Sequence, residues 1–214
     1  AELAKLFPLD ALRPETREQL GLEASITEYR RGENIFNAGD LDEDTVYVLD
    51  GEVKCEYPDG RVVAHVAGSG HGRYALNDAV PRRFTAKVGG ALVKALRLER
   101  RFVEKIITWD QLSRDPSYLF HDSRAGANSW VFRLLHSHAF IKLPTGNLER
   151  MFQAFEQVTV SPSEVVMKEG DAPDNFYVIR EGTAAVSKTL DGTSQVVAYL
   201  REGDVFGEDA LLAN

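Results

Sequence analysis

The sequence has little cysteine, no long apolar run and no basic cluster, and each absence excludes a class of protein. Cys55 is the only cysteine among 214 residues, so the chain can form neither an internal disulfide nor a cysteine-rich metal site. No stretch approaches the roughly 18 apolar residues that a membrane-spanning helix needs. The first ten residues contain no apolar signal-peptide core. The sequence therefore predicts a soluble, cytoplasmic protein.

The charge balance is acidic, which argues against two kinds of partner. Lysine and arginine number 25 and aspartate and glutamate 33, giving a net charge of 25 − 33 = −8. Basic side chains supply most of the affinity for nucleic acid, and they also attract proteins to anionic membrane surfaces. The 43% of hydrophobic and 27% of charged residues are ordinary for a globular chain. We therefore expect a globular protein that binds neither nucleic acid nor a membrane.

Two segments of the chain repeat one another at a constant offset. When they are superimposed, Gly39 falls on Gly170 (170 − 39 = 131) and Gly51 falls on Gly182 (182 − 51 = 131). A period of this length is far longer than the repeat unit of a solenoid. The repeat therefore predicts a duplicated domain.

Each copy carries the local signals of β structure. Val53 and Cys55 alternate with charged residues, which predicts a strand with one buried face. Asp-Gly pairs at 59–60 and 191–192 are typical of hairpin turns, where both residues must tolerate unusual backbone angles. Strands are expected near residues 26–37, 44–57, 61–67 and 84–98. Many short antiparallel strands with such turns predict a jelly-roll-type β-barrel.

Helical periodicity lies between the two β regions. Phe102, Ile106 and Trp109 share one face of a predicted helix, as do Trp130 and Leu134 of another. Helices are expected over 99–112, 129–143 and 148–156. The predicted domains are a first barrel over 1–112, a helical connector over 113–147 and a second barrel over 148–214.

The chain resembles the cyclic nucleotide-binding domain of catabolite activator proteins, kinase regulatory subunits and nucleotide-gated channels, here as a bacterial-type regulatory protein. The resemblance rests on Gly-Asp-Val-Phe-Gly-Glu-Asp-Ala-Leu at 203–211, and on a weaker version in the first copy that begins at Gly72. It implies a mainly β fold with α-helices. Two jelly-roll-type barrels would be joined by a helical connector, and the second barrel would be cut short.

The resemblance also implies a ligand site in the second copy. A glutamate beside a glycine would accept a hydrogen bond from the ribose 2′-hydroxyl, and the start of a short helix would face the cyclic phosphate. The matching residues are Phe206, Gly207, Glu208, Asp209, Ala210 and Leu211. The family's phosphate arginine would lie near residue 217, beyond Asn214, so we expect a longer parent protein.

The first copy has the opposite defect. The residues that match its site are Gly72, Arg73, Ala75, Arg82 and Arg83. The resemblance assigns the phosphate to Arg82, but Arg73 stands where the family has its ribose-binding glutamate. Arginine has donors only, so it cannot accept the hydroxyl proton. The first copy is therefore expected not to bind an ordinary cyclic nucleotide, although a ligand with more negative charge stays open.

Three weaker motifs are better explained by structure than by chemistry. Asp40, Asp42 and Asp44 imitate the start of a calcium loop, but Gly51 stands where the loop needs its final glutamate, so a solvated acidic turn is expected. Glycines over 68–72 lack the βαβ context of a dinucleotide site. His136 and His138 flank one residue of a helix and point apart. No metal site and no catalytic residue is predicted.

The sequence thus predicts a regulatory module without catalytic activity or cofactor. It would sense cAMP or cGMP and relay binding to an unknown effector through connector helices that move. The alternative is a degenerate pair of domains that serves protein interaction or dimerisation without nucleotide. An enzyme regulated from beyond residue 214 and a homodimer both stay open.

Overall fold

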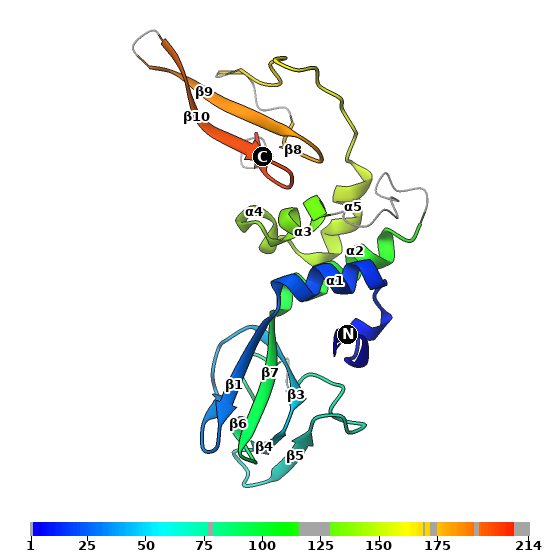
Figure 1. The fold of residues 1–214 in the computed structure, drawn as a ribbon, viewed down its shortest axis with the longest axis vertical. Helices are drawn as coiled ribbons and strands as arrows, with labels where there is room; N and C mark the ends of the chain where they lie inside the picture. Colours follow the sequence, from blue (N-terminus) through cyan, green and yellow to red (C-terminus); the bar gives the residue numbers. More distant parts are fainter. Residues whose placement is uncertain are drawn as a thin grey trace. The chain divides into compact units, whose positions relative to one another are not determined.

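The computed structural model describes residues 2–76, 79–115, 129–168, 170–171, 175–190 and 193–207. The chain divides into two compact units, Ala1–Asp110 and Gln111–Asn214 (Figure 1). Within the described ranges no helix is both long and apolar enough to cross a bilayer. Each unit is described by itself below.

The first unit combines short helices with two antiparallel sheets. Its elements are η1 (Glu2–Lys5), η2 (Leu9–Ala11), α1 (Pro14–Glu23), β1 (Ser25–Arg30), β2 (Asn34–Phe36), β3 (Asp44–Asp50), β4 (Glu52–Glu56), β5 (Val62–Val66), β6 (Thr85–Val88), β7 (Leu92–Glu99) and α2 (Arg100–Leu112). The strands are ordered β1-β7-β3 in one sheet (Figure 1). They are ordered β2-β6-β4-β5 in the other. Strand β7 therefore lies between β1 and β3, and β6 lies between β2 and β4, although both come later in the sequence than these neighbours.

Both sheets contribute to one apolar core. Ile35, Val48 and Ala86 belong to different strands and are all buried in it. On β4 the predicted alternation is confirmed, since Val53 and Cys55 are buried there. Burial raises the pKa of the Cys55 thiol to about 11. This cysteine therefore stays protonated at neutral pH and packs as a small apolar residue.

Three of the four predicted strands are broken into shorter ones. The expected strand 26–37 is interrupted at Gly32 (φ +88°), where Glu33 N donates to Arg30 O at 3.0 Å. The expected strand 44–57 is interrupted at Gly51 (φ +91°). A positive φ is accessible to glycine at little cost, and it reverses the chain instead of extending it. These glycines therefore determine where the strands end, which the alternation of apolar and polar residues did not predict.

The two copies share the same turn at the predicted offset of 131. In the first, Asp40 N donates to Asn37 O at 3.1 Å, and the Asp40 carboxylate accepts from Asn37 N at 2.6 Å. In the second, Asp171 N donates to Lys168 O at 3.1 Å, and its carboxylate accepts from Lys168 N at 2.8 Å. The glycine before each aspartate has φ of +91° and +92°. The repeat is therefore present in the backbone conformation as well as in the amino-acid sequence.

The described residues of the second unit form four short helices and two two-stranded ribbons. Its elements are α3 (Ser129–His136), α4 (His138–Ile141), η3 (Thr145–Asn147), α5 (Leu148–Gln153), β8 (Tyr177–Val178), β9 (Thr183–Leu190), β10 (Thr193–Arg201) and β11 (Val205–Phe206). Strand β9 pairs with β10 (Figure 1). Strand β8 pairs with β11. The predicted helix 129–143 breaks at Ser137, whose hydroxyl donates to Leu134 O at 2.7 Å. Serine competes in this way with the backbone bonds of a helix.

Helices and antiparallel sheets are thus confirmed as the architecture. The first unit forms two open sheets, and the described part of the second forms two ribbons. The Asp-Gly turn at 59–60 is also confirmed, because Gly60 has φ +86° and Tyr57 N donates to Arg61 O between β4 and β5. The turn at 191–192 lies outside the described residues. The tandem barrels and the shortened second barrel stay predictions.

Candidate functional site

In both copies the predicted site contains a glycine that has no room for a side chain. A Cβ at Gly72 would lie 2.1 Å from the carbonyl oxygen of Val66. A Cβ at Gly207, which has φ +76°, would lie 2.8 Å from the carbonyl oxygen of Asn175. In the first copy, Gly72 N also donates to the Ser69 hydroxyl at 3.0 Å. Gly72 is therefore packed against its own loop, and Gly207 against the segment that leads into β8.

Arg73, the residue after the first glycine, is tied to the N-terminal segment. Its guanidinium donates to the Asp10 carboxylate at 2.5 Å and lies 5.8 Å from the rings of Phe7 and Tyr74. The backbone oxygen of Arg73 also accepts from Phe7 N at 2.8 Å. Arg73 therefore pairs with a carboxylate of the protein, that of Asp10.

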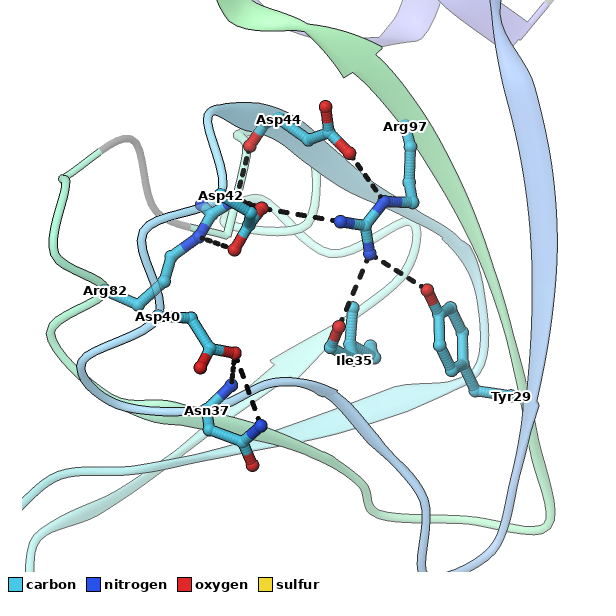
Figure 2. Close-up of polar contacts among 8 residues, drawn as sticks. All are labelled: Tyr29, Ile35, Asn37, Asp40, Asp42, Asp44, Arg82 and Arg97. Atoms are coloured by element: carbon cyan, nitrogen blue, oxygen red, sulfur yellow. Dashed lines mark hydrogen bonds and ion pairs between the residues drawn. The ribbon is translucent and has the colours of Figure 1, made fainter.

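Arg82, the predicted phosphate arginine, lies inside the first unit with its side chain 1% exposed. Nε donates to Asp42 Oδ2 at 3.0 Å, and Nη2 donates both to Asp42 Oδ1 and, at 2.5 Å, to Asp44 O (Figure 2). The guanidinium carbon lies 4.4 Å from the centre of the Phe36 ring. Arg82 is therefore held by a carboxylate fork, a carbonyl and an aromatic face.

Arg97 of β7 extends this ion-pair network. It donates to Asp44 Oδ2 at 2.9 Å and to the Tyr29 hydroxyl at 3.0 Å, and its Nη2 lies 3.4 Å from Asp42 Oδ1 (Figure 2). The hydrogen bond from Arg82, helped by the charges of both arginines, holds the pKa of Asp42 below its usual range despite burial. Asp42 is therefore a carboxylate at neutral pH.

The acidic loop is thus only partly what its sequence predicted. The carboxylates of Asp42 and Asp44 are partly exposed, as a solvated turn predicts, but they also pair with Arg82 and Arg97, which the sequence did not predict. The expectation of a solvated turn holds better for Asp40, which caps its own turn through Asn37 (Figure 2). Across the described part of the chain, no three His, Cys, Asp or Glu side chains are grouped so as to hold a metal ion.

The other predicted residues lie apart from the network. Ala75 is half-buried beyond the Gly72 turn, and Arg83 is exposed. In the second copy, Phe206 stacks on Tyr177 with ring centres 5.1 Å apart, where β11 pairs with β8. Gly207 follows it. Four predicted site residues lie outside the described residues, namely Glu208, Asp209, Ala210 and Leu211.

The turn that leads into the second motif is held by helix α3. A Cβ at Gly203 would lie 2.4 Å from Arg133 Cβ, and Arg133 Nη1 donates to Glu202 O at 3.2 Å. The Ser129 hydroxyl also bonds the Glu202 carboxylate. Helix α3 therefore positions the start of the motif within the second unit.

Comparison with known proteins finds a family match in the C-terminal part of the chain. The family model of the cyclic nucleotide-binding domain matches residues 157–214, which include the whole motif. Residues 157–214 are therefore similar to the cyclic nucleotide-binding domain. The resemblance stated from the sequence is thereby confirmed.

Full-length relatives extend the similarity toward the N-terminus. The cAMP-dependent protein kinase regulatory subunit of Mucor circinelloides f. lusitanicus is 27% identical over 183 residues, which cover 85% of this chain and 40% of that protein. The corresponding subunit of Eremothecium gossypii is 30% identical over 189 residues, covering 85% of this chain and 36% of that protein. The chain therefore spans less than half the length of these two relatives.

Among solved structures, the chain is similar to the regulatory domain of Toxoplasma gondii PKA with cAMP. That match has 19% sequence identity and a TM-score of 0.43, and it covers 99% of this chain and 78% of the other.

The sequence analysis missed the residues that pair with the two predicted arginines. Asp10 lies 63 residues from Arg73, and Asp42 lies 40 residues from Arg82. No local pattern joins residues so far apart. The one available signal was the alternation of aspartates at 40, 42 and 44, since alternate residues of an extended chain point the same way.

His65 on β5 makes the stability of the first unit depend on pH. The side chain is buried and its Nε2 has no hydrogen-bond partner, and burial together with the charge of His71 lowers the pKa of His65. Its neutral form thus contributes stability that is fully present above the unfolded pKa of about 6.5 and is lost as pH falls below it. We therefore expect the urea concentration at the unfolding midpoint to decrease when the pH is lowered from about 7.5 to about 5.5.

A His65→Phe variant should flatten this dependence, whereas His138→Gln, a change at an exposed position of α4, should leave it intact. The same slope in wild type and His65→Phe would show that another group is responsible.

Proposed function

We propose that the chain is a tandem cyclic nucleotide-binding regulatory module whose second unit takes the ligand and whose first unit is a scaffold. The observation that carries this proposal is the match of the family model to residues 157–214, which contain the complete motif 203–211. The curated relatives are named as regulatory subunits, which supports a role without catalysis.

The ligand we propose is cAMP or cGMP. The Glu208 carboxylate would accept a hydrogen bond from the ribose 2′-hydroxyl. The backbone at Gly207 would lie close to the cyclic phosphate. The positive φ of Gly207 and its contact with Asn175 support this role, because any side chain there would collide with the backbone. No cofactor is needed beyond the nucleotide.

A tandem arrangement is supported by the shared turns and by the reach of the curated matches. Both relatives match 85% of the chain, far more than the second unit alone. In the first unit, however, Arg73 and Arg82 each face a carboxylate of the protein. We therefore assign ligand binding to the second unit.

Relay to an effector is proposed to run through the helices between the two β regions. Trp109 of α2 and Trp130 of α3 are the two tryptophans of the chain, and both are buried. A ligand can shift such helices only if it binds two arrangements with different affinity. Intrinsic fluorescence therefore reports on this segment.

We expect saturating cAMP or cGMP to shift the tryptophan emission of a chain about 40 residues longer. Glu208→Ala should abolish the shift at the same nucleotide concentration, because the ribose loses its charged acceptor. Glu181→Ala is a matched control, since Glu181 is exposed and lies outside the motif. Saturable binding with unchanged emission would leave a module that holds ligand without moving these helices.

The second candidate is a protein-interaction or dimerisation scaffold without nucleotide. It is favoured by the β9–β10 ribbon, where Val196, Val197 and Tyr199 are strongly exposed. Clusters of exposed apolar residues commonly mark interaction sites. Failure of the longer chain to bind either nucleotide would favour this candidate. In both cases we propose a cytoplasmic protein that acts on an effector protein and not on nucleic acid.

A further inference from the structure

Strand β5 forms one edge of the sheet β2-β6-β4-β5 and carries neither an acidic side chain nor a lysine or arginine. From Val62 to Val66 its sequence is Val-Val-Ala-His-Val. All three valines are exposed, Val62 at 57%, and Ala64 is exposed as well. An apolar edge strand presents unpaired backbone groups and is a template for pairing with another chain.

The pairing of β5 with β4 determines which backbone groups of β5 face outward. At the start of the hairpin, Tyr57 N donates to Arg61 O at 2.9 Å. Bonded and non-bonded pairs alternate along an antiparallel ladder, so Val63 also directs its N–H and C=O toward β4. The N–H and C=O groups of Val62 and Ala64 therefore point away from β4. Within the described residues these outward groups have no hydrogen-bond partner.

The loop that follows β5 closes the other end of this edge. Ser69 donates to Val66 O from its backbone N at 3.2 Å and from its hydroxyl at 2.8 Å. A Cβ at Gly72 would lie 2.1 Å from the same oxygen. The open part of the edge is therefore the part around residues 62–64.

Strand β1 is the comparable edge of the other sheet, and its side chains differ from those of β5. It carries Glu28 and Arg30, and Glu28 forms an ion pair with Lys94 of the neighbouring strand. Charged side chains are a common protection of sheet edges against pairing with another chain. Strand β1 has this protection and β5 has not, although Ile26 of β1 is 62% exposed and thus as apolar at its surface as Val62.

We propose that β5 is a self-pairing edge, through which two copies of the chain join their sheets in antiparallel fashion about a two-fold axis at Val63. Val62 of each copy would face Ala64 of the other, and each such pair would exchange two backbone hydrogen bonds. A second copy fits this edge because the free donors and acceptors of β5 match one another under the two-fold axis. The side chains that meet are apolar, so no like charges of β5 oppose each other.

This inference goes beyond the proposed function, because it concerns the first unit and is independent of nucleotide binding by the second. The test is sedimentation velocity of the 214-residue chain between about 5 and 200 µM, at about 0.3 M salt to screen the net charge of −8. We expect a reversible dimer with a Kd of tens of micromolar, since so short a strand buries a small interface.

Two lysine variants distinguish β5 from the rest of the surface. Val62→Lys brings two like charges to the proposed axis and should weaken association at least about 10-fold. Ile26→Lys is the matched control, because it places the same charge on an exposed apolar residue of the other edge strand. Ile26→Lys should associate as the wild type does.

Ala64→Pro tests the backbone pairing itself. The Ala64 N–H points away from β4, so proline removes a donor to the second copy but no bond to β4. The dimer should be lost while the circular dichroism spectrum stays that of the wild type. In the wild type, the amide hydrogens of Val62 and Ala64 should exchange more slowly as the protein concentration rises, and that of Val63 should change far less.

The proposal fails if the chain stays monomeric at about 200 µM, a concentration at which a small interface is already populated. It also fails if a dimer forms and neither Val62→Lys nor Ala64→Pro weakens it. Loss of the dimer in Tyr199→Lys alone would assign association to the β9–β10 ribbon and would likewise overturn the proposal. Nucleotide binding is measured separately, so failure here is distinguishable from failure of the proposed function.

Discussion

Gly51→Ala is expected to lower the free energy of unfolding of the first unit by about 3 kcal/mol or more. Gly51 has φ +91°, and a Cβ there would lie 2.4 Å from the carbonyl oxygen of Leu92 and 3.1 Å from a methyl carbon of Val93. A non-glycine residue in this backbone region costs about 1–3 kcal/mol, and overpacking adds about 1–3 kcal/mol. Urea unfolding followed by circular dichroism measures the loss.

Gly60→Ala is the matched control for Gly51→Ala. Gly60 has a similar φ of +86°, but a Cβ there would meet no atom within 4 Å. Only the backbone cost remains, about 1–2 kcal/mol. Equal losses in the two variants would mean that contact with β7 does not restrict residue 51.

Asp110→Ala is expected to cost about 3 kcal/mol or more and to loosen α1. The Asp110 side chain is 0% exposed, and its Oδ1 accepts from the Thr16 hydroxyl at 2.5 Å and from Arg13 Nε at 3.0 Å. Arg13 N, at the start of α1, also donates to this oxygen at 3.3 Å. Removing one partner of a buried pair leaves the other groups unsatisfied, which is costly. Unfolding in urea and hydrogen exchange across α1 measure both effects.

Glu104→Ala on the same helix is the control for Asp110→Ala. Glu104 is 53% exposed and lies 3.9 Å from Arg100, a surface pair of little value. Its loss should change stability by less than about 0.5 kcal/mol. If Asp110→Ala lowered the free energy of unfolding by as little as Glu104→Ala, the contacts of Asp110 would not be responsible for holding α1 against the end of α2.

Local patterns predicted those parts of the fold that local chemistry decides. The alternation around Cys55 located β4, and the apolar stripe of Phe102, Ile106 and Trp109 located α2. Helix α1 was missed because it has no such stripe, and only Thr16 and Leu20 of its residues are buried. Its available signal was Pro14 at the first helical position.

The motif could be predicted from the sequence because its residues are contiguous, whereas the network around Arg82 could not. Arg82 and Asp42 come from segments that meet only when the loop after β2 pairs with residue 82. Sequence reasoning therefore assigned Arg82 to a ligand, while the structure gives it a protein carboxylate. Tertiary pairing of this kind cannot be derived from the spacing of charges alone.

The most direct test of the account is the stoichiometry of cyclic nucleotide binding, measured by calorimetry on a chain about 40 residues longer. We expect one site per chain. Glu208→Ala should weaken binding about 10- to 100-fold, since a hydrogen bond to a charged group contributes about 1.5–3 kcal/mol. Two sites per chain, or binding unaffected by Glu208→Ala, would contradict the assignment of the ligand to the second unit.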